Sequence, residues 1–213
     1  FDCKTTQNIL SIMSTSGMYD YSGQFAYDVG LTAQGTLIFH GAVGYSVKSA
    51  AGQASYYYSQ PFFEIAGTLR LPEGDVAVTG NAWLDREWSS QPLADNQTGW
   101  DWFSLSFDDG DKLMGFRLQQ TDGAHFTSAT WIDADGTTTP FSDGALTAIP
   151  LATNDADVPI RWNVTLPRKG VDVTVSAINN DAWMATSVPY WEGPVTVTGT
   201  HTGVGYLEMT GYE

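Results

Sequence analysis

Apolar and polar residues alternate with a period of two along most of the chain, which is the pattern of half-buried β-strands. From residue 100 onward these segments are separated by turn-forming runs such as Asp133-Ala134-Asp135-Gly136. The pattern predicts eight strands here, at 100–107, 112–119, 125–132, 137–147, 158–166, 171–178, 189–201 and 204–212. Eight antiparallel strands suit a closed barrel or a sandwich, and an eight-stranded barrel can hold one small ligand.

The first ninety residues follow this pattern less regularly. Strands are predicted at 35–40, 54–59, 61–71 and 75–88, and a turn or two of helix only over 5–16. Four or five strands are too few to close a barrel without exposed edges. The sequence therefore predicts two domains, with 1–90 as the incomplete latter part of a first barrel and 91–213 as a second, eight-stranded barrel. We expect the first domain to pack on the second, or to be completed by a separate N-terminal segment or chain.

The composition agrees with an all-β protein and excludes several classes of function. Hydrophobic residues make up 42% and aromatic residues 13%, with 22 glycines, which is typical of antiparallel sheets. A net charge of −15 repels phosphate, so we expect no nucleic-acid partner and no binding to anionic membranes. Cys3 is the single cysteine, which rules out an intrachain disulfide. The chain has no apolar run of the roughly 18 residues that a membrane helix needs.

Sequence motifs for metal, phosphate or nucleophile chemistry are missing. There is no H-E-x-x-H, no glycine-rich phosphate loop and no G-x-S-x-G. His40, His125 and His201 lie on separate predicted strands and could converge on a metal, but isolated strand histidines are more often ordinary polar side chains. The acidic turns lack the ligand spacing of calcium loops and are predicted to be hairpin turns. We therefore expect no metal and no organic cofactor.

Carboxylates and indoles concentrate in residues 83–102. If 75–88 is a strand, Trp83, Asp85 and Glu87 share one face and Arg86 lies on the other. A buried carboxylate needs a partner or stays protonated, and a protonated carboxyl group at neutral pH is a general acid. The alternative is a structural network, in which Arg86 or Arg117 pairs with these acids and holds two domains together. Likewise, the tryptophans are either core residues or the wall of a pocket for an apolar ligand.

Several segments of the chain resemble one protein family in their order and spacing. They are SYYYSQ at 55–60 with the apolar strand after it, AWLDREWSS at 82–90, GWDWFSLSFDDGDKLMGFRL at 99–118, YWEGPV at 190–195 and GYLEMTGY at 205–212. From about Gly44 onward the sequence resembles carotenoid 1,2-hydratase (hydroxyneurosporene synthase) and its AttH-type relatives, often described as predicted secreted hydrolases. The resemblance implies two lipocalin-like antiparallel β-barrels in tandem and a secreted or periplasmic location. The family includes carotenoid and phytoalexin hydratases and Diels–Alderases.

The resemblance also implies a ligand cavity where two barrels meet. Asp85, Glu87 and Asp101 would be its acid/base groups. Its ligand-binding residues would be Tyr58, Arg86, Trp88, Trp100, Trp102 and Trp191, of which the aromatic ones would line an apolar substrate and stabilise a carbocation. Two features depart from the family: the N-terminal half-barrel has no counterpart, and Arg86 stands where hydratases can carry histidine. An arginine favours an ionised carboxylate, which suits binding or a base better than proton donation.

These features leave three hypotheses for function. The first is a cofactor-independent enzyme, a hydratase, cyclase or isomerase that transfers protons on an apolar, isoprenoid- or polyketide-like small molecule. The second is a non-catalytic, lipocalin-like carrier of such a molecule, and the third is an attachment-related structural protein. An enzyme needs an acid facing its ligand, whereas a carrier needs only apolar walls, so the placement of the carboxyl groups discriminates between them.

Overall fold

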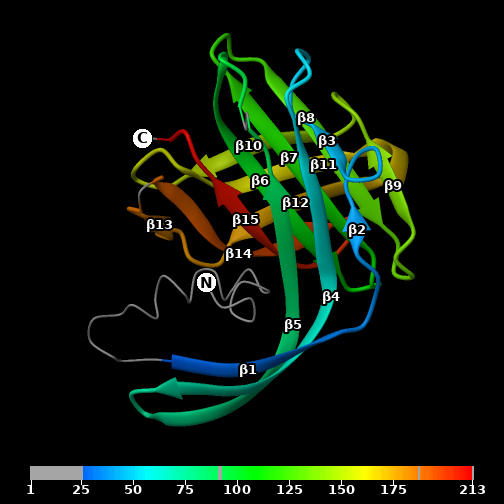
Figure 1. Ribbon diagram of the computed structural model, residues 1–213. Helices are drawn as coiled ribbons and strands as arrows, with labels where there is room; N and C mark the ends of the chain where they lie inside the picture. The colour runs from blue at the N-terminus through cyan, green and yellow to red at the C-terminus, as the bar shows by residue number, and fades with distance from the viewer. Residues whose placement is uncertain (1–25, 91–92, 187, 213) are drawn as a thin grey trace. The chain divides into compact units, whose positions relative to one another are not determined.

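The computed structural model describes residues 26–90, 93–186 and 188–212 (Figure 1). Their regular elements are β-strands apart from one 3-10 turn, Pro167–Lys169, so the predicted all-β fold is confirmed. The short helix considered over 5–16 lies outside the described residues. Within the described ranges, no helix has the length and apolar character that crossing a membrane requires.

By their contacts, the described residues divide into two compact units. Unit 1 contains residues 26–39 and 57–87, and unit 2 contains residues 40–56 and 88–212. The segment 40–56 therefore belongs with the later part of the chain, although it comes before most of unit 1 in the sequence. The domains expected from the sequence, 1–90 and 91–213, stay a prediction.

The first sheet is built around one long central strand, β4. Its strands are β1 (Ala26–Ala33), β2 (Ile38–Phe39), β3 (Tyr45–Val47), β4 (Ala54–Leu71) and β5 (Gly74–Trp88), and the other four all pair with β4. The chain turns from β4 into β5 at Pro72 and Glu73, as these turn-forming residues predict. β3 and the first residues of β4 belong to unit 2, whereas β1, β2 and the rest of β4 belong to unit 1.

The strand β4 joins two strands that the sequence pattern separates at Pro61. Proline has no N–H and normally interrupts a ladder of hydrogen bonds. Here β2 pairs with β4 as far as Ser59 and β1 begins to pair opposite Phe63, so Pro61 falls between the two partners. The Gln60 side chain covers the gap: its Oε1 accepts from the backbone N–H of Phe62 at 3.1 Å, and its Nε2 donates to a backbone carbonyl ahead of β2 at 2.8 Å.

Unit 2 contains a ten-stranded antiparallel sheet in the order β10-β11-β12-β14-β15-β6-β7-β8-β9, with β13 pairing with β14. Its strands are β6 (Gln97–Phe107), β7 (Lys112–Gln120), β8 (His125–Ile132), β9 (Thr138–Phe141), β10 (Thr147–Thr153), β11 (Pro159–Leu166), β12 (Val171–Ala177), β13 (Trp183–Met184), β14 (Tyr190–Gly199) and β15 (Gly203–Met209).

The sheet thus has two more strands than the eight expected from the sequence. Residues 137–147 are two strands instead of one, because Gly144 turns the chain with a φ of 79°. β10 carries Pro150 and ends the hydrogen-bonded path, which is where a sheet tolerates proline. β13 has only two residues and is too short to produce an alternating pattern.

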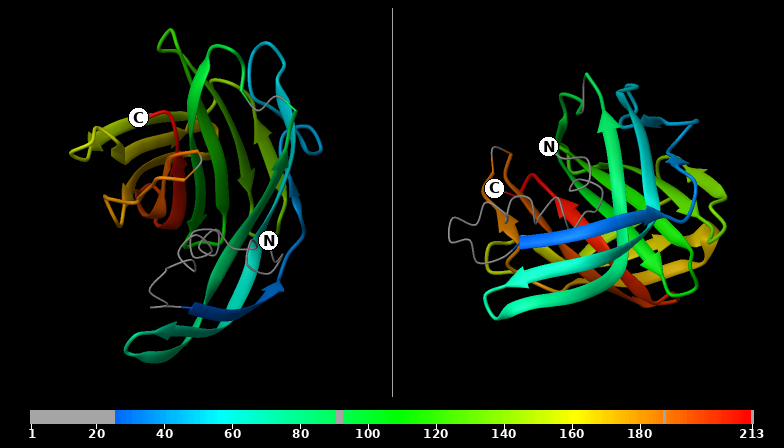
Figure 2. Two further views of the ribbon diagram at one scale, coloured as in Figure 1. Left: turned by 60° about the vertical axis from the view of Figure 1, so that its left-hand side comes forward. Right: turned by 60° about the horizontal axis from the view of Figure 1, so that its bottom comes forward.

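The sheet of unit 2 curls so that β10–β12 share one hydrophobic core with β6–β8 (Figure 2). Alternate residues of each strand point into this core, for example Phe103, Leu105 and Phe107 on β6. The ring of Phe103 meets that of Trp162 edge-on, with centroids 5.6 Å apart. Full burial of a large apolar side chain contributes about 1.5–3 kcal/mol, so this inner face supplies much of the stability of unit 2.

The other face of β7 and β8 is also buried, because the segment 40–56 packs on it. Nδ1 of His40 hydrogen-bonds to Oγ1 of Thr130 at 2.9 Å, and Nζ of Lys48 lies 3.9 Å from the ring centroid of Phe116. The side chain of Gln97 donates to the backbone carbonyl of Lys48 at 2.7 Å. Burial, with a smaller contribution from Lys48, lowers the pKa of His40 to about 3, so this histidine is neutral. These contacts explain why 40–56 groups with unit 2.

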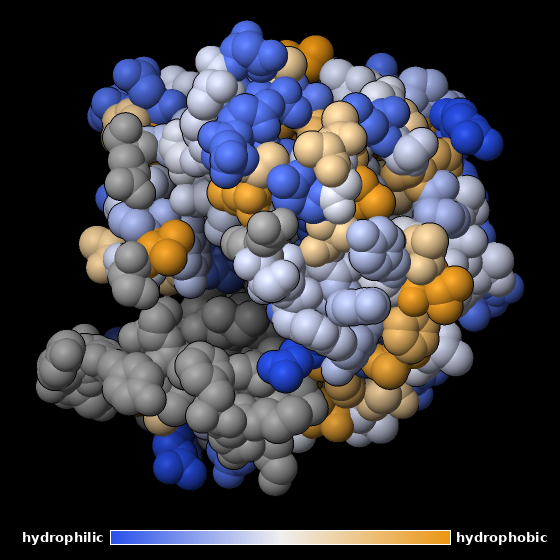
Figure 3. Space-filling view, turned by 45° about the horizontal axis from the view of Figure 1, so that its top comes forward, coloured by the Kyte–Doolittle hydropathy of each residue, from blue (hydrophilic) through white to orange (hydrophobic). Residues whose placement is uncertain are grey.

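Some exposed apolar residues gather around β3, where the rings of Tyr45 and Tyr56 lie 6.2 Å apart, and others are scattered. On the face seen in Figure 3, apolar residues lie among polar ones and do not form one continuous patch. Val43, Ile178 and Val204 are examples of large apolar side chains that are more than half exposed, and they belong to different strands and loops. Single exposed apolar residues are normal on soluble surfaces, so the chemistry must be sought among the buried polar groups.

Candidate functional site

Four acidic side chains on strands are buried or half-buried: Asp85 on β5, Asp101 on β6, Glu192 on β14 and Glu208 on β15. Asp85 and Asp101 are two of the three predicted acid/base groups, and the third, Glu87, is exposed. Asp85 belongs to unit 1 and the other three to unit 2. Because a carboxyl group that leaves water shifts its pKa or acquires partners, each of the four indicates a special local environment.

Asp85 is held in unit 1 between β4 and β5. Its residue as a whole is half-buried, but its carboxyl group is enclosed, and the hydroxyl of Ser59 on β4 donates a hydrogen bond to Oδ1. Burial, with a smaller contribution from the Glu87 carboxylate, raises the pKa of Asp85 to about 7, against the opposing effect of the Ser59 hydrogen bond. A carboxyl group with a pKa near 7 can both give and take a proton at neutral pH.

Replacing Ser59 by alanine is expected to raise the pKa of Asp85 above 7. The Ser59 hydroxyl stabilises the charged form of the carboxyl group and so lowers its pKa. Without this hydrogen bond, less opposes the effect of burial, which raises the pKa. Titration of the aspartate carboxyl carbons by NMR would measure the change, with the exposed Ser142→Ala as the control. An unchanged titration of Asp85 in the Ser59→Ala protein would contradict the assignment.

The other predicted residues around Asp85 are more exposed. Arg86 and Glu87 lie at the solvent-facing end of β5. Trp88 is 54% exposed and stacks on Tyr56 at 6.0 Å between ring centroids. Tyr58 is half-buried with its ring 6.2 Å from that of Phe39. Their predicted contacts with a ligand stay a prediction.

Asp101 lies on the inner face of unit 2 and forms an ion pair with Arg117. The two residues are direct neighbours on β6 and β7, and Nε of Arg117 donates to Oδ2 of Asp101 at 2.7 Å. The hydroxyl of Tyr212 donates to Oδ1 at 2.6 Å, and Nε2 of Gln119 lies 3.4 Å from the same oxygen. Burial raises the pKa of Asp101, and the Arg117 guanidinium and the Tyr212 hydroxyl oppose that effect.

Arg117 is itself well satisfied. Its Nη1 donates to the backbone carbonyl of Ala148 at 3.2 Å, and its guanidinium lies 4.7 Å from the ring centroid of Trp162. Such a buried pair is typical of a structural contact, and this one lies within unit 2. The ion pair between two domains that the sequence left open stays a prediction. Trp191 shares this inner face and is fully buried in the core.

Glu192 and Glu208 lie on the opposite face of the same sheet and face each other directly. Glu192 on β14 pairs with Glu208 on β15, which in turn pairs with Trp102 on β6. The indole N–H of Trp100 donates to Oε1 of Glu208 at 2.7 Å. Glu192 is 2% exposed, and among the described residues its Oε2 has no hydrogen-bond partner. Two of the predicted ligand-binding tryptophans therefore lie beside this carboxyl pair.

The environment of this pair keeps one proton bound at neutral pH. Burial and the facing Glu208 carboxylate raise the pKa of Glu192 to about 8. Burial and the same two carboxyl groups also raise the pKa values of Tyr190 and Tyr206, so both phenols stay neutral. Glu192 is therefore a carboxylic acid at pH 7, next to aromatic side chains that exclude water.

Neither Glu192 nor Glu208 was singled out by sequence reasoning, although a signal was available. Both lie within two of the segments that carry the family resemblance, at 190–195 and 205–212. The two strands form a hairpin in which Val197 pairs with Gly203, and counting five residues back and forward from this pair brings Glu192 opposite Glu208. Two acids paired across neighbouring strands repel each other unless one is protonated, which is the signal that was missed.

Among residues 26–90, 93–186 and 188–212, no group of three or more histidine, cysteine or acidic side chains is arranged to hold a metal ion. The three histidines have different surroundings. His40 contacts Thr130, His125 lies 3.4 Å from Arg117, and His201 packs on the ring of Phe107 with centroids 4.9 Å apart.

Comparison with known proteins identifies one family. A family model described as AttH-like matches residues 6–212. The crystal structure of an AttH protein from Nitrosomonas europaea is 34% identical with a TM-score of 0.81, and the match covers 89% of this chain and 63% of that one. Kievitone hydratase from Nectria haematococca is 18% identical with a TM-score of 0.71, and the match covers 88% of this chain and 61% of that one. The chain thus spans less than two thirds of both structures, and no curated protein matches it significantly.

Proposed function

Because the chain belongs to the AttH-like family, we propose that it binds an apolar, isoprenoid- or polyketide-like small molecule and transfers a proton to it. The reaction would be a cofactor-independent hydration, cyclisation or isomerisation. Hydration is included in this set because kievitone hydratase, which is 18% identical to this chain, shares its fold. Carotenoids are one substrate class within this proposal. The presence of Arg86 where carotenoid hydratases can carry histidine favours a different apolar substrate.

The observation that carries the proposal is the protonated Glu192 facing Glu208. Hydration of a C=C bond begins with a proton on carbon, and a carboxylic acid that is neutral at pH 7 and lies in an apolar, aromatic environment can supply it. The resulting carbocation would be stabilised by the faces of Trp100 and Trp102. Water then adds to the cation and releases its proton to Glu208, so alkene and water give an alcohol. Proton exchange between the two facing carboxyl groups restores Glu192.

Asp85 is a second acid/base group in this proposal. Its pKa of about 7 lets it give or take a proton, and it carries the role expected for it from the family resemblance. Glu87 and Asp101 remain predicted acid/base groups, but the exposure of Glu87 and the ion pair of Asp101 favour supporting roles.

Solvent deuterium distinguishes an enzyme from a carrier without knowledge of the substrate. The protein is incubated in D₂O with a panel of isoprenoid and polyketide alkenes, and the recovered molecules are weighed by mass spectrometry. Protonation of carbon leaves a deuterium atom in the product, and hydration adds the mass of water. We expect one class of alkene to be labelled, and Glu192→Gln to slow the labelling by at least about a hundredfold while binding is kept.

A second variant, Asp85→Asn, tests whether Asp85 also takes part in the proton transfer. The matched control is Glu73→Gln, because Glu73 is exposed. Equal labelling by the Glu192→Gln protein would reject the role of the carboxyl pair. An apolar molecule that is retained through purification but never labelled would favour the carrier. If no alkene binds at all, the apolar ligand itself would be refuted.

A further inference from the structure

A pocket of about 530 Å³ opens at one end of the curled sheet of unit 2. Val158, Trp183 and Tyr212 contribute apolar and aromatic surface to it, and Asn154, Asp181 and Thr186 contribute polar groups. Neither Glu192 nor Glu208 lines it, so ligand binding here can be tested apart from the proposed proton transfer. The volume is in the range of pockets that bind small molecules.

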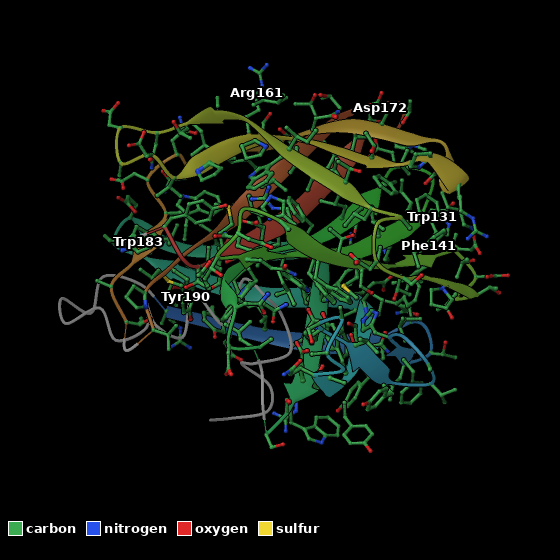
Figure 4. All side chains as sticks on the ribbon, turned by 90° about the horizontal axis from the view of Figure 1, so that it is seen from above. Trp131, Phe141, Arg161, Asp172, Trp183 and Tyr190 are labelled. Carbon is green, nitrogen blue, oxygen red and sulfur yellow. The ribbon has the colours of Figure 1, made fainter. Side chains whose placement is uncertain are left out.

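The opposite end of the curled sheet is filled by packed aromatic side chains. Figure 4 shows Trp183 and Tyr190 at the pocket end, and Trp131 and Phe141 at the other. Trp131 stacks on Phe107 with centroids 5.5 Å apart, and His201 covers both at 4.9 Å from Phe107 and 5.8 Å from Trp131. Nζ of Lys169 lies over Trp131 at 5.1 Å. The pocket is therefore at the open end of the curled sheet, and packed rings fill the other end.

Most polar groups of the pocket are already used by the protein. Oδ1 of Asn154 accepts from the backbone N–H groups of Ala156 and Val158 at 3.0 Å, and its Nδ2 donates to a backbone carbonyl at 3.0 Å. The hydroxyl of Thr186 donates to the carbonyl of Val188 at 2.7 Å. Asp181 differs, because its carboxylate oxygens accept no hydrogen bond from the described residues and are exposed. Its charge is available to a ligand.

The walls of the pocket are fixed in place from behind. The backbone carbonyl of Asn180, next to Asp181, accepts hydrogen bonds from Asn154 at 3.0 Å and from the indole of Trp191 at 3.4 Å. The hydroxyl of Tyr212 is held by the buried Asp101, to which it donates at 2.6 Å. Tyr212 thus offers its ring rather than its hydroxyl to the pocket. A site anchored in this way is largely preformed, which lowers the entropic cost of binding.

We propose that this pocket binds a small molecule that carries a protonated amine on a compact aromatic or apolar group. Asp181 supplies the counter-charge, and Trp183 and Tyr212 supply aromatic faces that attract a cation. No lysine or arginine is among the described residues that line it, and Arg117, which lies 3.3 Å from the Tyr212 hydroxyl, is paired with Asp101. The net charge of −15 further favours cations over anions.

Tryptamine and tryptophol test this proposal, because they differ only in an ammonium or a hydroxyl group at the same position. Isothermal titration calorimetry with the whole chain is expected to show tryptamine binding about fivefold more tightly than tryptophol. The substitution Asp181→Asn should weaken tryptamine about fivefold and leave tryptophol unchanged. Asp109→Asn is the matched control, because Asp109 is exposed in the turn between β6 and β7 and does not line the pocket, and it should affect neither ligand.

The proposal is overturned if tryptamine and tryptophol bind with equal affinity, or if neither binds. It is also overturned if Asp181→Asn and Asp109→Asn weaken tryptamine equally, because the attraction would then come from the overall charge of the protein. A loss of both ligands on Trp183→Leu, with the fold retained by circular dichroism, would place the binding in this pocket. Full binding by that variant would exclude it.

Discussion

Replacing Arg117 by methionine is expected to lower the free energy of unfolding by about 3–5 kcal/mol. The substitution leaves the Asp101 carboxyl group, which is 0% exposed, without the guanidinium that donates to it at 2.7 Å. It also removes the hydrogen bond to Ala148 and the contact with Trp162. Methionine keeps most of the aliphatic volume of arginine. The decrease in the free energy of unfolding therefore reflects the unpaired Asp101 carboxylate and the lost guanidinium contacts, and not a cavity. Urea denaturation at pH 7 measures it.

The ion pair between Lys169 and Asp133 provides the control. Its atoms are 3.3 Å apart, but its side chains are 24% and 37% exposed, so Lys169→Met should cost no more than about 1 kcal/mol. The Arg117→Met protein should also recover stability as the pH is lowered from 7 to 5. Burial raises the pKa of Asp101 above its unfolded value, and the folded state then takes up a proton that the unfolded state does not. Equal losses in the two variants would show that the buried pair does not hold unit 2 together.

Much of the fold follows from the alternating pattern. The sequence predicts the strands β6, β7 and β8 to within a few residues, because apolar side chains recur along them and the turns between them contain Asp and Gly. The alternating pattern does not predict the strands correctly where side-chain hydrogen bonds take the place of backbone pairing, or where a strand is very short. Gln60 carries β4 past Pro61, and Gly144 divides a segment that reads as one strand. Neither effect is visible in the alternation itself.

The family resemblance predicted more than the pattern could. The AttH-type relationship and the lipocalin-like, all-β fold are confirmed by the family match and by the AttH structure. The concentration of acids and indoles at 83–102 drew attention to Asp85, and burial raises the pKa of its carboxyl group to about 7. The roles of the predicted site residues stay predictions.

Alternation along single strands cannot predict which residues face each other across neighbouring strands, because these pairs depend on the register of the sheet. Asp101 and Trp102 are adjacent in the chain but point to opposite faces, and only the pairing with β7 and β15 shows that one meets Arg117 and the other Glu208. Glu192 stands opposite Glu208 through the hairpin of β14 and β15. The sequence shows which residues share one face of a strand. The register of the sheet determines which residues of neighbouring strands lie opposite each other.

Glu192→Gln is expected to make the protein more stable than the wild type above pH 8. The pKa of Glu192 is about 8 in the folded protein and 4.5 in an ordinary environment, so the folded state holds an extra proton between these values. Wild-type stability is therefore highest below this window and falls as the pH rises through it. Glutamine resembles the neutral acid and cannot ionise. We expect the variant to be within about 1 kcal/mol of the wild type at pH 5 and about 2–4 kcal/mol more stable at pH 9.

Urea denaturation from pH 5 to 9 measures the free energy of unfolding of both proteins. The contribution of other titrating groups such as Asp85 cancels in the difference between them. Glu208→Gln should act in the same direction, because it removes the facing charge that raises the pKa of Glu192. The exposed Glu73→Gln should follow the wild-type curve. If the Glu192→Gln and wild-type curves run parallel over this range, Glu192 holds no extra proton. The carboxyl pair could then not act as the acid in the proposed reaction, and Asp85 would be the remaining group with a suitable pKa.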